Sequence, residues 1–577
     1  MAVLKLAIVL LSSVVILLVS PAPIVKTQNT PLASGFGETL VRYDYNRTGT
    51  ATATSNIVTP HARWTFLTDG TIATGPLAAD LNKDGKMEIF LADARADALP
   101  RTMYSLDFAG NLRWTTPAKW DVLPAAIADL NHDGIVEVIF SEINHAPAGG
   151  LNIYVMNASD GKIIWNYTDH GVWEEGFASG PIIYDVNGDG VDDITLGSMD
   201  FYVYTFSGMT GAILWKSPTF EHYIRTTSPF YDLNMDGEKD FVVWDNHAIT
   251  RAYSIKTHAL LWEKTLGYGT AISPAIGDLN GDGKPEIVFA SVVSGGINVL
   301  RGDGSILWTN STYLNVYHSP SLLDVDGDGL LDVVIGDSGR HAITAFKGST
   351  GAWLWETILP GTWSQGPIVN ADIDSDGTKE ILVGSDSGLN SLNSKTGAIE
   401  WTFSADKVRS EPRVIDIDRD GKAEILFGAG DGKLYVLDQL PPPRFNPRTI
   451  GYWKHQCSVT TPSEVHVGIP QSFIDAIRGQ SAVFSSLMTK EEACSILWGD
   501  YKSDMAGRAR QQLLALWLNV VSGFVDPSAP INLPKLTSAT TVGGAILDAE
   551  NIILTHTDKP SLERAKDICD SLNNGIR

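Results

Sequence analysis

One acidic pattern of nine residues occurs eight times along this chain of 577 residues and constrains its fold more than any other feature. Every copy has Asp at position 1, Leu, Val or Ile at 2, Asn or Asp at 3, Asp at 5, Gly at 6 and Asp or Glu at 9. Consecutive copies start 44 to 56 residues apart, and such a period is typical of a propeller or a solenoid. The copies begin at Asp80, Asp129, Asp185, Asp232, Asp278, Asp324, Asp372 and Asp416.

A tryptophan recurs with the same period. Most copies end a hairpin such as "TGAILW" or "DGKIIW", in which a Gly-containing turn joins two β-prone runs. Each period also holds three further short runs, for example "SPAIGD", "EIVFAS" and "INVLRG", and no helical stretch. Four short strands per period predict one blade of a β-propeller. The repeated tryptophans are Trp64, Trp114, Trp165, Trp215, Trp262, Trp308, Trp355 and Trp401.

The two ends of the repeat region complement each other. The last acidic copy is followed by "KLYVLD" but by no tryptophan strand, whereas the first tryptophan strand, "HARWTF", has no acidic copy before it. Pairing the two completes an eighth blade and leaves no exposed sheet edge. We therefore expect an all-β domain over residues 60–439, an eight-bladed β-propeller of four-stranded blades closed by the N-terminal Trp strand. A seven-bladed ring would leave one acidic copy without a blade.

The acidic pattern has the donor atoms of a calcium loop. Ca²⁺ takes about 6–8 oxygen ligands, whereas Mg²⁺ requires a tighter octahedron and Zn²⁺ favours nitrogen and sulfur. Position 7 varies freely, as expected if it offers only its carbonyl oxygen, and position 12 is apolar, which excludes an EF-hand. We predict up to eight Ca²⁺, one per blade. The predicted ligands are Asp80, Asn82, Asp84, Glu88, Asp129, Asn131, Asp133, Glu137, Asp185, Asn187, Asp189, Asp193, Asp232, Asn234, Asp236, Asp240, Asp278, Asn280, Asp282, Glu286, Asp324, Asp326, Asp328, Asp332, Asp372, Asp374, Asp376, Glu380, Asp416, Asp418, Asp420 and Glu424.

Bound cations would explain the unusual charge of the chain. It has 67 acidic and 43 basic residues and a formal net charge of -24, and eight Ca²⁺ would neutralise 16 of those charges. An acidic surface repels nucleic acid and anionic lipid. We therefore expect no nucleic-acid partner and favour an extracellular protein or glycan ligand.

The acidic copies resemble the FG-GAP repeats of the integrin α-subunit propeller and related VCBS-like repeats. The variants "SGP" at Ser179–Pro181 and "SP" at Ser273–Pro274 precede the loop, as in that family. The resemblance implies a Ca²⁺ in the loop between the first two strands of each blade, held by the side chains named above. The "GAxxW" hairpins also resemble pyrroloquinoline-quinone propeller repeats, which belong to eight-bladed proteins.

The N-terminus has the layout of a secretory signal. Lys5 precedes an apolar run from Leu6 to Val19, and small residues follow around Ala22. We expect a signal peptide over residues 1–22, with an uncleaved membrane anchor as the alternative, then an N-terminal extension over 23–59. The protein would be secreted or held at the cell surface. Four sequons are compatible with glycosylation: Asn46, Asn157, Asn166 and Asn310.

The sequence changes character after the propeller. A Pro-rich linker over 440–448 leads to a small all-α domain over 449–577, in which Thr489 and Glu492 form a capping box. Its start resembles the "GYWK" module of secreted bacterial and archaeal surface proteins, whose aromatic residues we expect in the core, with ligand binding as the alternative. One disulfide and one thiol are expected, with the pairing left open among Cys457, Cys494 and Cys569.

Three functional classes remain open. We favour a non-enzymatic, calcium-binding adhesion or ligand-binding protein. A polysaccharide lyase of the rhamnogalacturonan-lyase type is the first alternative, because one such family is an eight-bladed propeller with similar calcium loops, and its base and substrate-binding cations would come from His222, Arg225, His318 and Arg409. A quinoprotein dehydrogenase is the second. Arg301-Gly302-Asp303 lies in a Trp hairpin, so we expect it to form a turn.

Overall fold

The computed structural model describes residues 48–576 apart from 73, 94–100, 119–120, 144–150, 170–175, 178, 225–227, 246–248, 267–272, 292–295, 312–315, 317, 362–366, 440–445, 458–468 and 488. The predicted signal, Asn46 and Arg225 lie outside these residues. The chain divides into two compact units, Met1–Gln439 and Leu440–Arg577. No helix among the described residues has the length and apolar character needed to cross a membrane.

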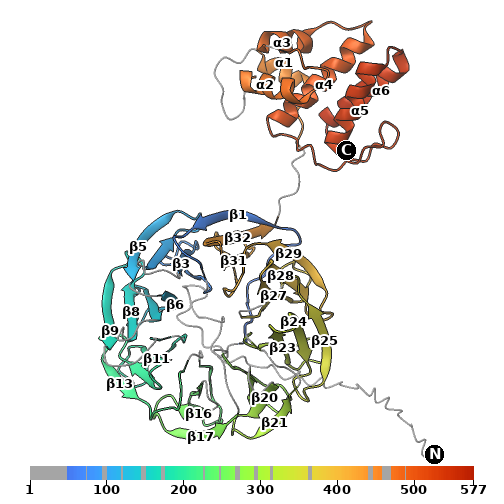
Figure 1. Ribbon diagram of the computed structural model, residues 1–577. Helices are drawn as coiled ribbons and strands as arrows, with labels where there is room; N and C mark the ends of the chain where they lie inside the picture. The colour runs from blue at the N-terminus through green and yellow to red at the C-terminus, as the bar shows by residue number, and fades with distance from the viewer. Residues whose placement is uncertain are drawn as a thin grey trace, which may run out of the picture. The chain divides into compact units, whose positions relative to one another are not determined.

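The first unit is a ring of eight four-stranded antiparallel sheets, as predicted (Figure 1). The first, innermost strands are β2 (Leu77–Ala79), β6 (Asp121–Ala128), β10 (Ile182–Tyr184), β14 (Phe230–Tyr231), β18 (Ala275–Gly277), β22 (Ser321–Leu323), β26 (Val369–Ala371) and β30 (Arg413–Ile415). The second strands are β3 (Glu88–Ala92), β7 (Glu137–Ile143), β11 (Asp193–Gly197), β15 (Asp240–Trp244), β19 (Glu286–Ser291), β23 (Asp332–Asp337), β27 (Glu380–Ser385) and β31 (Glu424–Gly428). The third strands are β4 (Arg101–Leu106), β8 (Leu151–Asn157), β12 (Val203–Phe206), β16 (Ile249–Ser254), β20 (Gly296–Arg301), β24 (Ala342–Phe346), β28 (Gly388–Asn393) and β32 (Lys433–Gln439). The fourth, outermost strands are β5 (Leu112–Ala118), β9 (Ile163–Asp169), β13 (Ile213–Lys216), β17 (Leu260–Thr265), β21 (Ile306–Asn310), β25 (Trp353–Ile358), β29 (Ile399–Ser404) and β1 (Pro60–Leu67).

We number the blades 1 to 8 in the order of their first strands, β2 to β30. Blade 8 is closed by the N-terminal strand β1, which pairs antiparallel with β32 from Pro60↔Gln439 to Leu67↔Lys433. Its inner residues then pack on blade 1 in one apolar cluster that includes Leu426, Val436 and Ile89. The predicted closure by the Trp strand is therefore confirmed, and the ring has no free edge in blade 8.

The repeated tryptophans join neighbouring blades. The Trp165 indole N–H donates to the carbonyl of Gly208 in the next blade, over 2.7 Å, and four other tryptophans make the same bond. A glycine in the hairpin of the next blade packs against the indole ring. A Cβ atom added at Gly211 would lie only 2.5 Å from Cε3 of Trp165. In blade 4 the glycine is replaced by His258, which stacks on Trp215 with 4.3 Å between ring centroids. Each Trp hairpin is thus a joint between two blades.

Residues 48–59, which were expected to precede the propeller, pack along its inner strands. Thr50 forms a parallel bridge with Asn370 of β26, and the backbone N–H of Leu322 in β22 donates to the carbonyl of Thr48. Ala51 and Ile57 are buried in the apolar cluster shared by blades 7 and 8. This segment therefore belongs to the folded unit and spans three blades.

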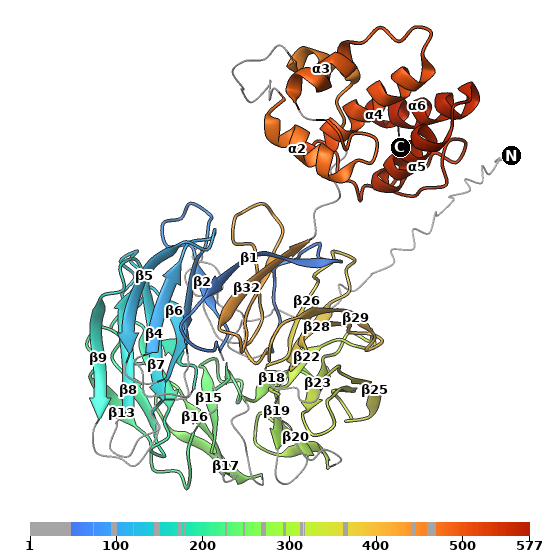
Figure 2. The same ribbon diagram turned by 45° about the horizontal axis from the view of Figure 1, so that its top comes forward.

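The second unit contains six helices within its described residues. They are α1 (Ile450–Gln456), α2 (Gln471–Gln480), α3 (Lys490–Trp498), α4 (Met505–Val521), α5 (Val542–Thr555) and α6 (Lys559–Asn573). Figure 2 shows α4, α5 and α6 side by side, and their apolar faces form one core. The capping box of Thr489 and Glu492 is present at the start of α3.

The "GYWK" segment forms α1 and contributes to that core. Trp453 is fully buried, and its indole N–H donates to Oδ1 of Asn519 in α4, whereas His455 is exposed. The core role expected for this tryptophan is confirmed. Cys457 and Cys494 form the single disulfide, which ties α1 to α3, and Cys569 is a buried thiol.

Candidate metal centres

The acidic loops share one hydrogen-bond pattern in all eight blades. The carboxylate at position 1 accepts from the backbone N–H of the position 6 glycine, as in Gly85 N–H to Asp80, which are 2.6 Å apart. The carboxylate at position 5 accepts from the N–H of position 7. The glycine has φ between 79° and 92°, in the left-handed region that other residues resist. The loop is thus folded by its own carboxylates, and in most blades the second oxygen of position 1 also accepts a hydrogen bond, from the N–H of position 4 or 5.

Position 9 is the first residue of every second strand, and this strand is buried in the blade. Its carboxylate accepts from the backbone N–H of position 2, for example from Leu130 to Glu137. The aliphatic side chain at position 2 is also in the apolar core in most blades. The hydrogen bond between positions 2 and 9 and the packing of position 2 in the core therefore hold the two ends of the loop together.

Burial makes the carboxyl group at position 9 harder to ionise. Desolvation raises the pKa of Glu137 and Glu286 to about 7 and that of Glu380 to about 8, and the hydrogen bond from position 2 offsets only part of this. The shorter Asp193 and Asp240 are raised to about 6 for the same reason. A nearby cation would compensate for such a buried carboxylate.

Blades 6, 7 and 8 show the donor set most clearly, because position 3 is Asp in each. In every one of these loops, one carboxylate oxygen from each of positions 1, 3 and 9 lies within 4.8 Å of the other two. In blade 7, Oδ1 of Asp372 and Oε1 of Glu380 are buried and have no hydrogen-bond partner, and the same is true of Oδ1 of Asp240 in blade 4. These orphaned oxygens fit a hard divalent cation, because all the donors are oxygen.

The carboxylates at positions 1, 3 and 9 of these three loops therefore lie close enough together to hold a metal ion, and their oxygen donors are compatible with Ca²⁺. Bound calcium would supply positive charge and would link the start of the second strand to the end of the first strand.

The proposed catalytic side chains differ in their surroundings. His318 is fully buried against Gly336, and this burial lowers its pKa to about 4. Because the side chain is not exposed, the expectation that His318 could contact a substrate is wrong. His222 is half-buried, with its ring against Phe201 and Tyr223 and its backbone N–H bonded to Asp245. Arg409 is exposed. Among the described residues, no hydrogen bond or ion pair links these three side chains.

Arg301-Gly302-Asp303 forms a turn, as expected. The N–H of Gly304 donates to the carbonyl of Arg301, and the Asp303 carboxylate accepts from the N–H of Ser305. The carbonyl of Gly302 receives the indole N–H of Trp262. The tripeptide thus serves the joint between blades 4 and 5.

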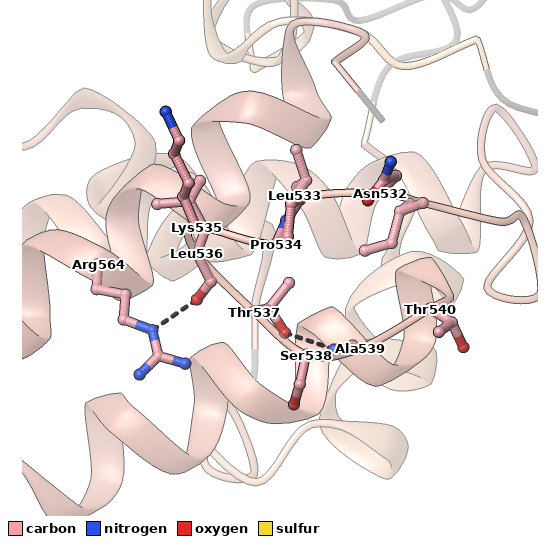
Figure 3. Close-up of a pocket in the computed structure, with 11 residues that line it drawn as sticks. Asn532, Leu533, Pro534, Lys535, Leu536, Thr537, Ser538, Ala539, Thr540 and Arg564 are labelled. Carbon is pink, nitrogen blue, oxygen red and sulfur yellow. Dashed lines mark hydrogen bonds between the residues drawn. The ribbon is translucent and has the colours of Figure 1, made fainter.

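The helical unit carries an open depression of about 590 Å³, lined by residues 531–540 and Arg564 (Figure 3). Arg564 is its one charged group besides Lys535, and its Nε donates to the carbonyl of Leu536 over 2.5 Å. This arginine therefore holds the loop in place, and the lining contains no acidic or nucleophilic cluster.

Comparison with known proteins supports the fold. A family model described as an FG-GAP-like repeat matches residues 232–289 and 324–383. A search of curated proteins gave no match. Among solved structures, the V. cholerae biofilm matrix protein Bap1 is similar with a TM-score of 0.50 and 15% identity, over 66% of this chain and 91% of Bap1.

Two dehydrogenases are similar at the same level. The quinohemoprotein alcohol dehydrogenase of Comamonas testosteroni matches with a TM-score of 0.52 and 12% identity, over 85% of this chain and 96% of its own. A europium-containing methanol dehydrogenase matches with a TM-score of 0.50 and 12% identity, over 70% and 98%. At such identities the likeness concerns the fold alone. The chain contains an eight-bladed β-propeller, in which residues 232–289 and 324–383 match FG-GAP-like repeats, and a helical C-terminal domain.

Proposed function

We propose that this protein is an extracellular, calcium-stabilised propeller that binds a protein or glycan ligand and does not catalyse a reaction. The observation that carries the calcium part is the pair of buried, unpartnered carboxylate oxygens on Asp372 and Glu380, in a loop whose pattern occurs in every blade. The disulfide and the signal-like N-terminus support a location outside the cytoplasm.

The topology favours one face of the ring for the ligand. In each antiparallel blade, the acidic loop and the Trp hairpin lie at the same ends of the strands, and both are nearly identical from blade to blade. The ends of the strands that lead from one blade to the next lie at the opposite face, and the sequences that connect them differ. A repeated scaffold with one variable face provides an asymmetric binding surface, so we assign the ligand to that face.

Calcium dependence is tested by thermal unfolding with calcium and after thorough chelation. We expect a higher Tm with calcium, because a ligand at 100 times its Kd stabilises the folded state by about 2.7 kcal/mol per site. Glu380→Gln should reduce this gain, whereas Glu263→Gln, on the outer strand β17, should leave it unchanged. Equal Tm values with and without calcium would contradict the structural role.

The ligand is tested on arrays of glycans and extracellular proteins, with the calcium-loaded protein as probe. Retention of a defined glycan or protein supports the proposal. Release of unsaturated uronate from pectic polymers would instead assign the lyase activity, and release of a quinone on denaturation would assign the quinoprotein class.

A further inference from the structure

Each outermost strand of the propeller contains a β-bulge directly before its tryptophan. The residue at the bulge is the extra one in the pairing with the third strand. It is aliphatic in five blades and charged in the other three. From blade 1 to blade 8, the bulged residues are Arg113, Ile164, Leu214, Leu261, Leu307, Leu354, Glu400 and Arg63.

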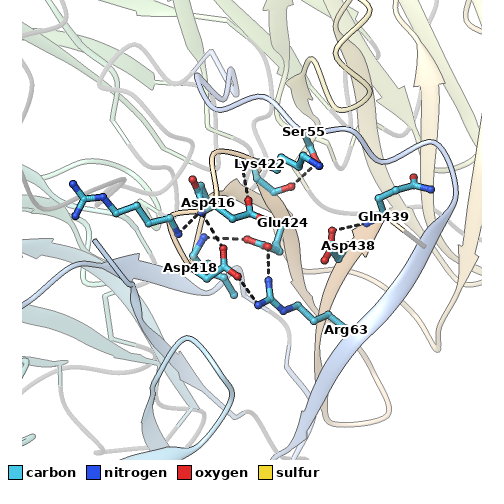
Figure 4. Close-up of polar contacts among 12 residues, drawn as sticks. Ser55, Arg63, Asp416, Asp418, Lys422, Glu424, Asp438 and Gln439 are labelled. Carbon is cyan, nitrogen blue, oxygen red and sulfur yellow. Dashed lines mark hydrogen bonds and ion pairs between the residues drawn. The ribbon is translucent and has the colours of Figure 1, made fainter. Parts of the chain in front are cut away.

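In blade 8 the bulged residue reaches into the acidic loop (Figure 4). Nη2 of Arg63 lies 2.5 Å from Oδ2 of Asp418, and Nη1 lies 2.6 Å from Oε1 of Glu424. The Glu424 side chain is only 1% exposed. Asp418 and Glu424 are two of the three carboxylates that form the candidate metal cluster of this blade, with Asp416.

The guanidinium therefore uses the oxygens that a cation would need. Glu424 already receives the N–H of Ile417 on its other oxygen, so the contact with Arg63 completes its bonding. An arginine stays charged at every accessible pH, and a divalent ion between the same carboxylates would be repelled by it. A planar fork with two donors also fits two carboxylates better than a single ammonium does.

Three other blades differ from this arrangement. In blade 1 the bulged residue is also an arginine, Arg113, and it lies close enough to Glu88 to interact electrostatically, but its described hydrogen bond is to Oγ of Ser105 and no ion pair with the loop is found among the described residues. In blade 6, Nζ of Lys347 contacts Asp326 and Asp328, whose side chains are 28% and 34% exposed, and it does not reach the buried Asp332 within the described contacts. In blade 7 the bulged residue is Glu400, whose negative charge adds to the acidic loop instead of neutralising it. A cation is favoured in blade 7 and disfavoured in blade 8.

We propose that Arg63 takes the place of the cation in blade 8, so that the blade formed by the two ends of the propeller is closed by an internal ion pair and binds no calcium. The inference rests on the proposed calcium loops of the other blades. It lowers the expected number of ions to at most seven.

The test counts calcium ions per folded chain by equilibrium dialysis and atomic emission. Arg63→Leu gives blade 8 the bulged residue of blades 3 to 6, and we expect the variant to bind one ion more than the wild type. Arg340→Leu is the matched control. It removes the same charge from an ion pair with Glu356, at the face opposite the acidic loops, and should leave the count unchanged.

A reciprocal variant covers the case in which Arg63→Leu does not fold. Leu307→Arg places an arginine at the bulge of blade 5, and we expect this variant to lose one ion. Anomalous diffraction from crystals soaked in a lanthanide should show which loop gains or loses the ion.

The outcomes separate this inference from the proposed function. Eight ions in the wild type, an unchanged count in folded Arg63→Leu, or an unchanged count in Leu307→Arg would overturn the inference and leave the calcium role intact. No ion in any variant would overturn both.

Discussion

The joint between a tryptophan and a glycine is the smallest repeated unit of this ring. The indole ring of one blade covers the glycine of the next, and its N–H closes a hydrogen bond to the same hairpin. The regular spacing of the tryptophans predicted the blades, but their role as joints could not be seen, because the partner lies about 40 residues ahead. The sequence did contain a sign of these joints, because a glycine stands four residues before most of the repeated tryptophans.

The joint predicts the effect of one added methyl group. Gly211 has φ +68°, and a Cβ there would meet Trp165 at 2.5 Å, so Gly211→Ala should cost about 2–4 kcal/mol in the free energy of unfolding. Urea titration followed by tryptophan fluorescence measures this loss. Gly188→Ala is the control, because Gly188 has φ +76° and open space, at a loop position where other blades carry Lys83 or Ser375. Similar losses in both variants would show that backbone strain alone acts at Gly211.

At the scale of elements, the N-terminal segment is an addition that the repeat does not contain. The N–H of Ile57 donates to the carbonyl of Ile373 in the loop of blade 7, and the carbonyl of Thr54 accepts from the N–H of Ala423 in the loop of blade 8. Ser55 bonds to both loops through Ala423 and Ser375. Residues 54–57 thus lie between two neighbouring acidic loops. In two other places, the loops of adjacent blades bond directly to each other.

Loss of this segment should weaken the ring where blades 7 and 8 meet. A chain that begins at Val58 loses the burial of Ala51 and Ile57 and the backbone bonds to three blades, so we expect the propeller to lose about 3–5 kcal/mol. Differential scanning calorimetry measures the Tm of the propeller in this truncated chain and in a chain that begins at Thr48. If both chains melt at one temperature, the segment does not contribute to the stability of the ring.

At the scale of the whole molecule, covalent and ionic stabilisation are divided between the two units. The disulfide lies in the helical unit, and all the acidic loops lie in the propeller. The propeller consequently depends on its closed ring, its inter-blade joints and its loops. The helical unit has a core of apolar helix faces with a disulfide that closes 37 residues.

This division predicts two independent responses in one calorimetric experiment. A reductant opens the Cys457–Cys494 crosslink, so it should lower the free energy of unfolding of the helical unit by roughly 2–4 kcal/mol and reduce its Tm. The Tm of the propeller should not change. A chelator should lower the Tm of the propeller and leave the Tm of the helical unit unchanged. Cys457→Ala with Cys494→Ala is the matched variant for the reductant. A shift of both transitions by either treatment would show that the two units unfold together.

The sequence alone determined the number of blades, the four strands of each, the closure by the Trp strand and the eight acidic loops. These features depend on local patterns that repeat, so eight copies reinforce one prediction. Only the tertiary structure decided which distant residues meet. Arg63 lies 361 residues from Glu424 in the chain, His318 became buried against Gly336, and residues 54–57 entered between two loops. Such contacts arise because ring closure brings the two ends of the domain together, and no local preference of the chain encodes them.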